Sequence, residues 1–195
     1  MDGYDAVVYD LDGTLVELAV DWERLAREAA TVYRSAGVDP PSGDLWRLMD
    51  VADEHGLEEE VSAVVCERER AGAARSRRLP LADDLLARAS AGVPVGVCSL
   101  NCEASVRVAL AEHGLRESVR REAVVGRDTV ETRKPEPESL LWACQKLGVA
   151  PDRTLFVGDS PRDERTAERA GTGFAYVEEF GDDEGGPSDA GTDEN

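Results

Sequence analysis

The sequence predicts an α/β fold, and two observations carry that prediction. Short apolar runs of strand length recur along the 195 residues, and stretches with helical spacing separate most of them. Strands that alternate with helices favour a Rossmann-like parallel sheet flanked by helices. A third observation modifies this plan, because a long segment without strand-like runs follows the first strand. We therefore expect a small all-helical insert after the first strand.

The expected strands are short apolar runs, and each is long enough for one buried strand. The first run precedes the helical insert and the others follow it. Together they form the predicted sheet, at residues 5–10, 93–98, 123–125, 155–157 and 174–177.

Two of the segments between these runs are predicted helices that end at a glycine. Residues 101–113 precede Gly114, and residues 136–147 precede Gly148. Glycine adopts the left-handed conformation that closes many helices. The first of these helices is expected to be amphipathic, with one apolar face formed by Ala104, Val108 and Ala111.

The helical insert is expected over residues 16–80, where charged residues interleave with Leu, Ala and Val at helical spacing. Ser42 is a plausible N-cap because it follows a turn that contains two prolines. The predicted core is then residues 1–15 and 81–177. The insert is predicted to hold three helices, at about residues 22–36, 42–55 and 57–77.

The segment from residue 178 to residue 195 has a different composition from the rest of the chain. It is acidic, rich in Gly, Asp and Ser, and contains no Lys or Arg. Such a segment cannot bury enough apolar surface to fold. We predict a disordered tail.

The chain is strongly acidic, with 22 basic and 41 acidic residues and a formal net charge of −19. Nucleic acids and anionic membranes would be repelled by such a field, so neither is an expected partner. Lys134 and Lys146 are the only lysines, and the other basic residues are arginines. Because salt screens repulsion between carboxylates, we hypothesise a halophilic source.

The four cysteines have neither a zinc-binding spacing nor a dense disulfide pattern, so we expect free buried thiols. The chain shows no charged leader followed by an apolar segment, and no apolar run approaches the ~18–20 residues of a membrane span. These observations predict a cytoplasmic protein. The cysteines are Cys66, Cys98, Cys102 and Cys144.

The segment from Asp10 to Leu15, with the sequence Asp-Leu-Asp-Gly-Thr-Leu, directly follows the first predicted strand. Two carboxylates this close need a cation between them. At the carboxyl end of a parallel strand they would lie where open α/β sheets bind ligands. Gly13 would let the backbone turn tightly around an anion. The segment therefore predicts a metal-dependent anion site.

Three further polar motifs follow later predicted strands or lie near them. Ser99 ends the apolar run of the second strand, and Lys134 precedes a proline that favours an extended conformation for it. The last motif follows residues 155–157 and contains Gly158, Asp159, Ser160 and Asp163.

The four motifs, in this order, resemble the signature of the haloacid dehalogenase-like hydrolase superfamily. The resemblance spans residues 5–177 and implies phosphoryl transfer through an enzyme aspartate. Asp10 is then the nucleophile and Asp12 the general acid and base. An extended backbone would direct the side chains of Asp10 and Asp12 to the same side of the chain, which fits these paired roles.

The same chemistry needs a cation, and Mg²⁺ is expected because it prefers oxygen ligands and binds through one or two carboxylates plus substrate phosphate. Asp10 and Asp159 would supply the carboxylates. The resemblance adds the backbone carbonyl of Asp12 as a third ligand. It also implies that Asp163 lies just outside the ligand set and orients water or the lysine.

The phosphate group of the substrate is expected to contact Ser99, Lys134, Thr14 and the amide of Gly13. The chain departs from the commonest family pattern at one point. Leu100 directly follows Ser99, where an asparagine or a small residue often stands, so we leave Asn101 out of the predicted site.

Within the superfamily, residues 16–80 occupy the position of a helical cap that closes over the active site. Asp12 disfavours dehalogenation, since displacing a halide needs no proton donor. The insert contains no lysine, which disfavours Schiff-base hydrolases and sugar phosphomutases. The chain is therefore most similar to phosphoglycolate phosphatases, with a small phosphorylated metabolite as its substrate and a monomer or homodimer as its assembly.

Some residues of the predicted helices have two interpretations. Trp22, Trp46 and Trp142 fall at apolar helix positions and are expected to pack in the interior, although the first two could line a substrate pocket. Six arginines of the insert could bind a second anionic group, although a solvated helix face is the commoner role. They are Arg24, Arg27, Arg68, Arg75, Arg77 and Arg78.

Two other functions remain open from the residues alone. One is a phosphotransferase or mutase that acts on a sugar phosphate. The other is a non-catalytic phosphate-binding module, including a phosphorylation switch of the receiver type. A binding module does not need both a nucleophile and an acid, so the presence of Asp10 and Asp12 favours an enzyme.

Overall fold

The computed structural model describes residues 3–180 of the chain, and these contain a five-stranded parallel sheet with the order β5-β4-β1-β6-β7. Every neighbouring pair of strands in the sheet is parallel. The α/β prediction is confirmed, and each of the five predicted apolar runs forms one strand. The strands are β1 (Ala6–Tyr9), β4 (Val95–Cys98), β5 (Val124–Val125), β6 (Thr154–Gly158) and β7 (Gly173–Tyr176).

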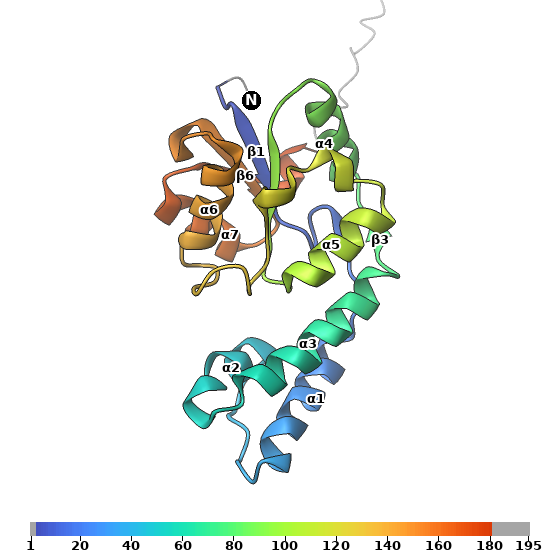
Figure 1. Cartoon of the computed structure of the whole chain (residues 1–195), viewed down its shortest axis with the longest axis vertical. Helices are drawn as coiled ribbons and strands as arrows, with labels where there is room; N and C mark the ends of the chain where they lie inside the picture. The colour runs from blue at the N-terminus through green and yellow to red at the C-terminus, as the bar shows by residue number, and fades with distance from the viewer. Residues whose placement is uncertain (1–2, 181–195) are drawn as a thin grey trace, which may run out of the picture.

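Helices cover both faces of the sheet, as Figure 1 shows. Alternate residues of β1 point to opposite faces: Val7 belongs to an apolar cluster with α4 and α5, and Val8 to one with α6 and α7. The sheet is therefore buried on both sides. The covering helices are α4 (Leu81–Ser90), α5 (Glu103–Glu112), α6 (Glu138–Leu147) and α7 (Pro161–Ala170).

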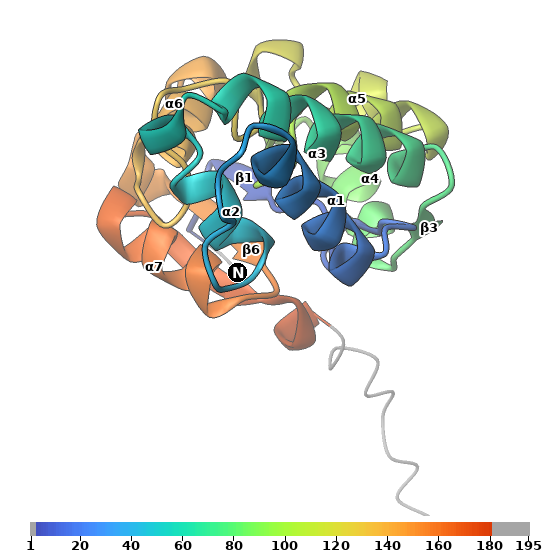
Figure 2. The ribbon, with the colours of Figure 1, turned by 90° about the horizontal axis from the view of Figure 1, so that it is seen from below.

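The insert after the first strand has an apolar cluster of its own, to which Leu25, Leu48 and Val61 belong. It lies beyond the carboxyl ends of the strands, and α3 runs alongside α5 in both views (Figures 1 and 2). Its helices are α1 (Trp22–Ser35), α2 (Leu45–Asp50), α3 (Glu58–Ala73) and the short 3-10 helix η1 (Asp53–His55).

A small antiparallel ribbon joins the insert to the sheet domain, formed by β2 (Val16–Glu17) and β3 (Arg77–Arg78). We expected no strand between residues 16 and 80, and this was wrong. Two residues per strand are too few for an apolar alternation to be visible, and β3 consists of two arginines. The ribbon instead depends on tertiary pairing across the two connecting segments.

The second helix of the insert also differs from the prediction. It ends at Asp50, short of the expected residue 55, and η1 follows as a separate turn. Its N-cap is Asp44 and not Ser42, because the Asp44 carboxylate accepts a hydrogen bond from the Arg47 amide at 3.0 Å. The third helix ends at Ala73 because the chain then turns into β3.

The predicted apolar face of α5 was wrong as well. Ala104 and Ala111 are exposed. The buried side of the helix is instead the one that carries Val106 and Leu110, because these two large apolar side chains remove more surface from water when they pack. Its buried residues are Ser105, Val106, Ala109 and Leu110. The predicted glycine ends are confirmed, with left-handed φ values of 69° at Gly114 and 75° at Gly148.

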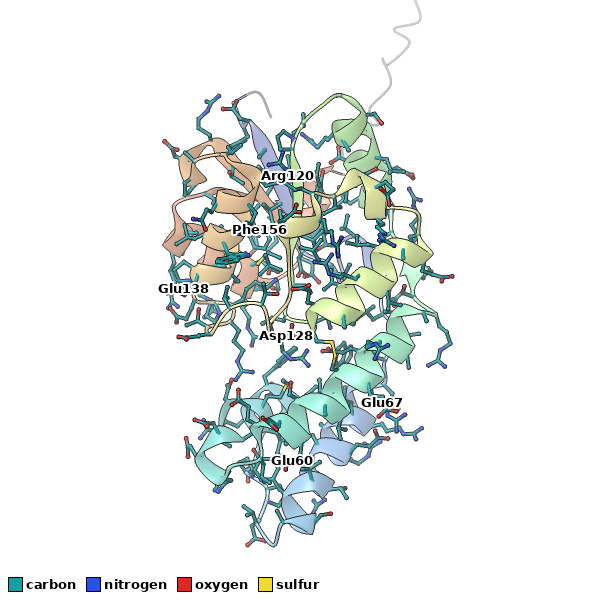
Figure 3. All side chains as sticks on the ribbon, viewed as in Figure 1. Glu60, Glu67, Arg120, Asp128, Glu138 and Phe156 are labelled. Atoms are coloured by element: carbon teal, nitrogen blue, oxygen red, sulfur yellow. A yellow bond between two sulfur atoms is a disulfide. The ribbon has the colours of Figure 1, made fainter. Side chains whose placement is uncertain are left out.

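Cys66 of α3 and Cys102 before α5 form a disulfide that joins the insert to the sheet domain, seen as the yellow bond in Figure 3. The expectation of free thiols was therefore wrong for this pair, whose 36-residue separation matches no compact disulfide spacing. It is confirmed for Cys98 and Cys144, which are free and buried.

The start of the predicted acidic tail is ordered, since residues 178–180 belong to the 3-10 helix Val177–Phe180. The rest of the expected tail, residues 181–195, lies outside the described part of the chain. Among the helices of residues 3–180, none combines the length and the apolar character that crossing a membrane requires.

Candidate active site

Polar side chains gather where the parallel strands end, as expected for an open α/β sheet. Asp10 directly follows β1, Ser99 follows β4 and Asp159 follows β6. They border a cavity of about 450 Å³ between the sheet edge and the insert, here called the carboxyl-edge cavity. Of the predicted site residues, the cavity brings together Asp10, Asp12, Ser99, Lys134, Asp159 and Asp163.

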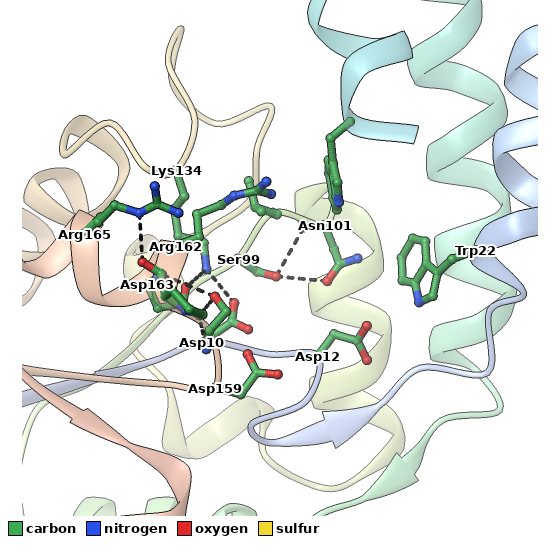
Figure 4. Close-up of a pocket in the computed structure, with 14 residues that line it drawn as sticks. Asp10, Asp12, Trp22, Ser99, Asn101, Lys134, Asp159, Arg162, Asp163 and Arg165 are labelled. Atoms are coloured by element: carbon green, nitrogen blue, oxygen red, sulfur yellow. Dashed lines mark hydrogen bonds and ion pairs between the residues drawn. The ribbon is translucent and has the colours of Figure 1, made fainter. Parts of the chain in front are cut away.

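Lys134 lies at the centre of a buried charge cluster (Figure 4). Its ammonium donates hydrogen bonds to Asp10 Oδ1 at 2.7 Å, to Asp163 Oδ1 at 2.5 Å and to the Cys98 carbonyl at 3.2 Å. The peptide bond from Lys134 to Pro135 is cis. The cluster therefore fixes Lys134 between the ends of β1 and β4 and the start of α7.

The surroundings of this cluster change the acidity of its members. Burial raises the pKa of Asp10 above the ordinary aspartate value, although the charge of Lys134 opposes this shift. Burial alone would lower the pKa of Lys134, but Asp10 and Asp163 raise it beyond the ordinary lysine value. Lys134 therefore remains a cation at neutral pH.

Asp12 lies at the same edge in different surroundings. Its half-buried carboxylate accepts a hydrogen bond from the Leu18 amide at 2.7 Å. Burial raises the pKa of Asp12 to about 6, and the Leu18 hydrogen bond partly opposes the rise. Within residues 3–180, no basic side chain forms an ion pair with Asp12. A carboxyl with this pKa can give or take a proton near neutral pH.

Gly13 is required by the geometry beside Asp159. Its φ is 86°, and a Cβ atom there would lie 2.1 Å from Asp159 Oδ2. Any other residue would therefore displace the carboxylate of Asp159. Gly13 thus serves to bring the backbone after β1 close to this side chain.

The structure does not place Gly13 and Thr14 in the predicted phosphate cradle. The Gly13 amide already donates to the Val16 carbonyl at 2.8 Å. Both residues border a different cavity beside Leu81, and the buried Thr14 hydroxyl has no hydrogen-bond partner among the described residues. The tight turn after β1 uses the amide that we expected to bind phosphate.

A divalent cation fits the acidic residues of the carboxyl-edge cavity. Carboxylate oxygens of Asp10, Asp159 and Asp163 lie within 4.8 Å of one another. An all-oxygen donor set suits hard cations. Asp163 was expected just outside the ligand set. It is part of this group, and its Oδ1 atom also accepts a hydrogen bond from the Lys134 ammonium. The carboxylate of Asp12 is outside it, which is compatible with an expected contribution through the backbone carbonyl.

Asn101, which was not among the predicted site residues, also borders the carboxyl-edge cavity. Its Oδ1 atom accepts a hydrogen bond from the Ser99 hydroxyl at 3.0 Å, and both residues are buried. Leu100 separates them in sequence, but the turn before α5 returns Asn101 to the cavity. The sequence feature that could have predicted this position was an asparagine two residues after the serine.

The remaining wall of the cavity includes side chains that the prediction missed or assigned elsewhere. Arg162 and Arg165, from the first turns of α7, line it together with Trp22 and Trp46 of the insert. The guanidinium carbon of Arg162 lies 5.4 Å from the centre of the Trp46 ring. The sequence feature that could have predicted this basic wall was the pair of arginines directly after the Asp159 motif, in a helix that starts there.

The six arginines of the insert are not among the residues that line the cavity. The commoner role on a solvated helix face fits Arg24, Arg27, Arg68, Arg75 and Arg77, which are exposed. Interior packing was wrong for Trp142, which is 37% exposed and faces the ammonium of Lys146 at 4.2 Å. Trp22 and Trp46 are partly buried against the apolar cluster of the insert, as expected, and they also line the cavity, as the alternative allowed.

Comparisons with known proteins agree with this arrangement. A family model described as haloacid dehalogenase-like hydrolase matches residues 4–171. A phosphoglycolate phosphatase of Rhodospirillum rubrum is 32% identical over 185 aligned positions, and the match covers 85% of this chain and 76% of that protein. A phosphoglycolate phosphatase of Escherichia coli K12 is 30% identical over 172 residues, which cover 86% of this chain and 64% of that protein.

A solved structure has the same arrangement of elements. It is a haloacid dehalogenase-superfamily hydrolase, subfamily IA, from Geobacter sulfurreducens, with a TM-score of 0.60 and 25% sequence identity. The match covers 88% of this chain and 88% of that one. The fold is thus shared with a solved haloacid dehalogenase-superfamily hydrolase.

Proposed function

The chain belongs to the haloacid dehalogenase-like hydrolase family, and from that premise we propose that it is a phosphatase acting on a small phosphate monoester through an aspartyl phosphate at Asp10. One observation carries the proposal. A buried carboxylate held by Lys134 lies in the same cavity as a second carboxyl whose pKa is about 6. Nucleophilic catalysis followed by hydrolysis needs this pair of groups.

In the first step, an Asp10 carboxylate oxygen forms a bond to phosphorus while the bond from phosphorus to the leaving oxygen breaks. Asp12 donates its proton to that leaving oxygen. In the second step, Asp12 removes a proton from water, whose oxygen attacks phosphorus and releases Asp10 and inorganic phosphate. The pKa of Asp12 near 6 supports its use as acid and then as base.

The phosphate group is proposed to lie against Ser99 and Lys134. Lys134 offers a fixed positive charge, and the Ser99 hydroxyl lies at the cavity wall. Positive groups held in place before the reaction stabilise the charge of the transition state. Asp163 keeps Lys134 in position through their ion pair at 2.5 Å.

Mg²⁺ is the proposed cofactor, held by the carboxylates of Asp10 and Asp159 and the backbone carbonyl of Asp12. When bound, it would offset the repulsion between the phosphate and the carboxylates. The close approach of Asp10, Asp159 and Asp163 supports this placement. Gly13 permits it, since a side chain there would move Asp159.

Residues 16–80 are proposed to act as a cap over a catalytic core of residues 1–15 and 81–177. The insert has its own apolar cluster, and Trp22 and Trp46 reach the cavity from it. Arg162 and Arg165 add positive charge on the core side. This charge favours a substrate with a second anionic group, in line with a phosphoglycolate phosphatase-like activity.

The net charge of −19 supports a salt-rich cytoplasm as the proposed location. Melting curves at low and high salt test this part separately. We expect the melting temperature to rise with salt, and full stability in low salt would contradict the halophilic origin.

The test of the catalytic proposal is hydrolysis of p-nitrophenyl phosphate in high salt, with Mg²⁺ and with a chelator. Asp10→Asn is expected to lower the rate by at least about a thousandfold, because it removes the nucleophile. Asp5→Asn, an exposed carboxylate next to β1, is the matched control and should keep the wild-type rate. Equal, slow phosphate release by wild type and Asp10→Asn would refute the proposal. Transfer of the phosphate to another product would favour a phosphotransferase.

A further inference from the structure

Glu69 is a fully buried carboxylate of the insert that reaches into the sheet domain. It belongs to α3 and has an exposed fraction of 0%. Its oxygens accept hydrogen bonds from Asn101 Nδ2 at 3.2 Å, from the Cys102 amide at 2.9 Å and from Arg127 Nη1 at 2.7 and 2.6 Å. These donors come from the loops after β4 and β5, and not from the insert.

The hydrogen bond from Glu69 fixes the orientation of the Asn101 carboxamide. Because the carboxylate can only accept, Asn101 must turn its Nδ2 toward Glu69 and its Oδ1 the other way. That Oδ1 accepts a hydrogen bond from the Ser99 hydroxyl at 3.0 Å. In turn, Ser99 Oγ accepts a hydrogen bond from the backbone N–H of Asn101 at 3.2 Å. A hydrogen-bond chain therefore runs from Glu69 through Asn101 to Ser99 at the cavity.

We propose that Glu69 is a positioning residue which, through Asn101, holds the Ser99 oxygen at the cavity wall, so that the insert completes the phosphate-binding loop of the core. The single hydroxyl proton of Ser99, given to Asn101 Oδ1 in the free protein, turns to the substrate phosphate when it binds, while the Ser99 oxygen still accepts from the backbone N–H of Asn101. The proposal rests on the proposed phosphatase activity and deepens it. The insert would then contribute to phosphate binding as well as covering the cavity.

The energetic position of Glu69 supports a role beyond filling space. Burying a carboxylate is costly, and an apolar pair of similar size in place of Glu69 and Arg127 would pack at this point without that cost. Arg127 offsets the charge, with its own side chain only 3% exposed. The pair uses two buried charged residues to hold a loop of the cavity in one arrangement.

The alignment of α3 with this loop is fixed by a second contact. Cys66 lies three residues before Glu69, on the same side of the helix. Its disulfide partner, Cys102, is the residue whose amide binds Glu69. The covalent bond and the hydrogen bonds thus act on one short segment, residues 101–102, directly after Ser99 and Leu100.

Glu69→Gln tests the proposal with little change of shape. The new amide cannot accept all of the present donors, so Asn101 loses its fixed orientation. We expect the KM for p-nitrophenyl phosphate and the inhibition constant of inorganic phosphate to rise roughly tenfold, with a smaller change in kcat. Glu67→Gln, on the exposed side of the same helix, is the matched control and should leave both constants unchanged (Figure 3).

A double-mutant cycle separates positioning from a general loss of structure. If Glu69 acts through Ser99, then Glu69→Gln should change kcat/KM less than about twofold in a Ser99→Ala background. Losses that multiply in the double variant would overturn the proposal, and so would wild-type constants for Glu69→Gln. If the wild type itself has no phosphatase activity, the proposed function fails instead.

A second variant covers the case in which Glu69→Gln does not fold. Asn101→Ala removes the relay but keeps the contacts of Glu69 with Arg127 and Cys102. We expect Asn101→Ala to raise the inhibition constant of phosphate roughly tenfold. Adding Ser99→Ala to this variant should not raise the constant further. A wild-type constant for Asn101→Ala would overturn the proposal.

Discussion

Asp10 and Asp12 are two residues apart, yet they occupy unlike surroundings. Asp10 is 6% exposed and lies 2.7 Å from the ammonium of Lys134, in a buried cluster with Asp163. Asp12 is half-buried and receives one amide hydrogen bond. The same side chain can therefore serve as a nucleophile held by a cation, or as a proton carrier with a pKa near 6. The difference lies in the environment and not in the residue type.

The largest effect that can test this comparison is expected from Asp12→Asn. An asparagine cannot carry the proton, so hydrolysis of an alkyl phosphate should fall by about 10²- to 10⁴-fold. Formation of the aspartyl phosphate from p-nitrophenyl phosphate should be less affected, because nitrophenolate leaves without a proton. Stopped-flow absorbance should then show a burst of nitrophenol. An equal loss of the first step with both substrates would contradict the role of Asp12.

A second experiment removes the cation from the buried cluster. Lys134→Met leaves Asp10 and Asp163 buried without a counter-charge, which should cost about 3–5 kcal/mol of folding free energy. Thermal unfolding in the presence of a chelator measures this loss, expected as a fall of roughly 10 °C in Tm.

The chain provides a matched control, since Lys146 is its other lysine. It lies over the exposed Trp142 ring, so Lys146→Met should cost less than about 1 kcal/mol. Similar melting temperatures for the two variants would show that the buried cluster does not depend on Lys134.

The smallest effect is expected on the open wall of the carboxyl-edge cavity. Arg162→Leu removes a charge that faces Trp46, so KM for a phosphate ester with a carboxylate should rise about tenfold. KM for p-nitrophenyl phosphate, which lacks that group, should stay near the wild-type value. Steady-state kinetics with both substrates measure the difference. Arg169→Leu, exposed on the same helix, is the control, and equal changes for both substrates would exclude recognition of the second anion.

The sequence predicted the part of the site that depends on strand ends. Asp10, Ser99 and Asp159 each follow an apolar run, and parallel strands necessarily bring such residues to one edge. Lys134 could be found because it is one of two lysines and precedes a proline. Four of the five strands, β1, β4, β5 and β6, are fully buried and were visible in the sequence as short apolar runs. The fifth, β7, is only partly buried but is also apolar in sequence.

The parts that were missed depend on how distant segments pack. Trp46 and Arg162 meet only because the insert lies over the start of α7, and no local pattern encodes that approach. Cys66 and Cys102 pair across 36 residues. The amide of Gly13 is used by the turn to Val16, which is a matter of local backbone geometry that its residue type does not reveal.

The Cys66–Cys102 bond has a consequence for how the cavity can open. Near this bond the insert is held covalently and by Glu69, whereas α2 contacts the core through a partly exposed ion pair of Asp50 with Arg133 and through Trp46 and Arg162. Because the insert is fixed to the core on the side of α3, it should rotate about α3 and not move away as a whole when the carboxyl-edge cavity opens. Amide hydrogens of α2 should then exchange with solvent sooner than those around Glu69. Substrate should enter the carboxyl-edge cavity on the side where α2 and Trp46 border it.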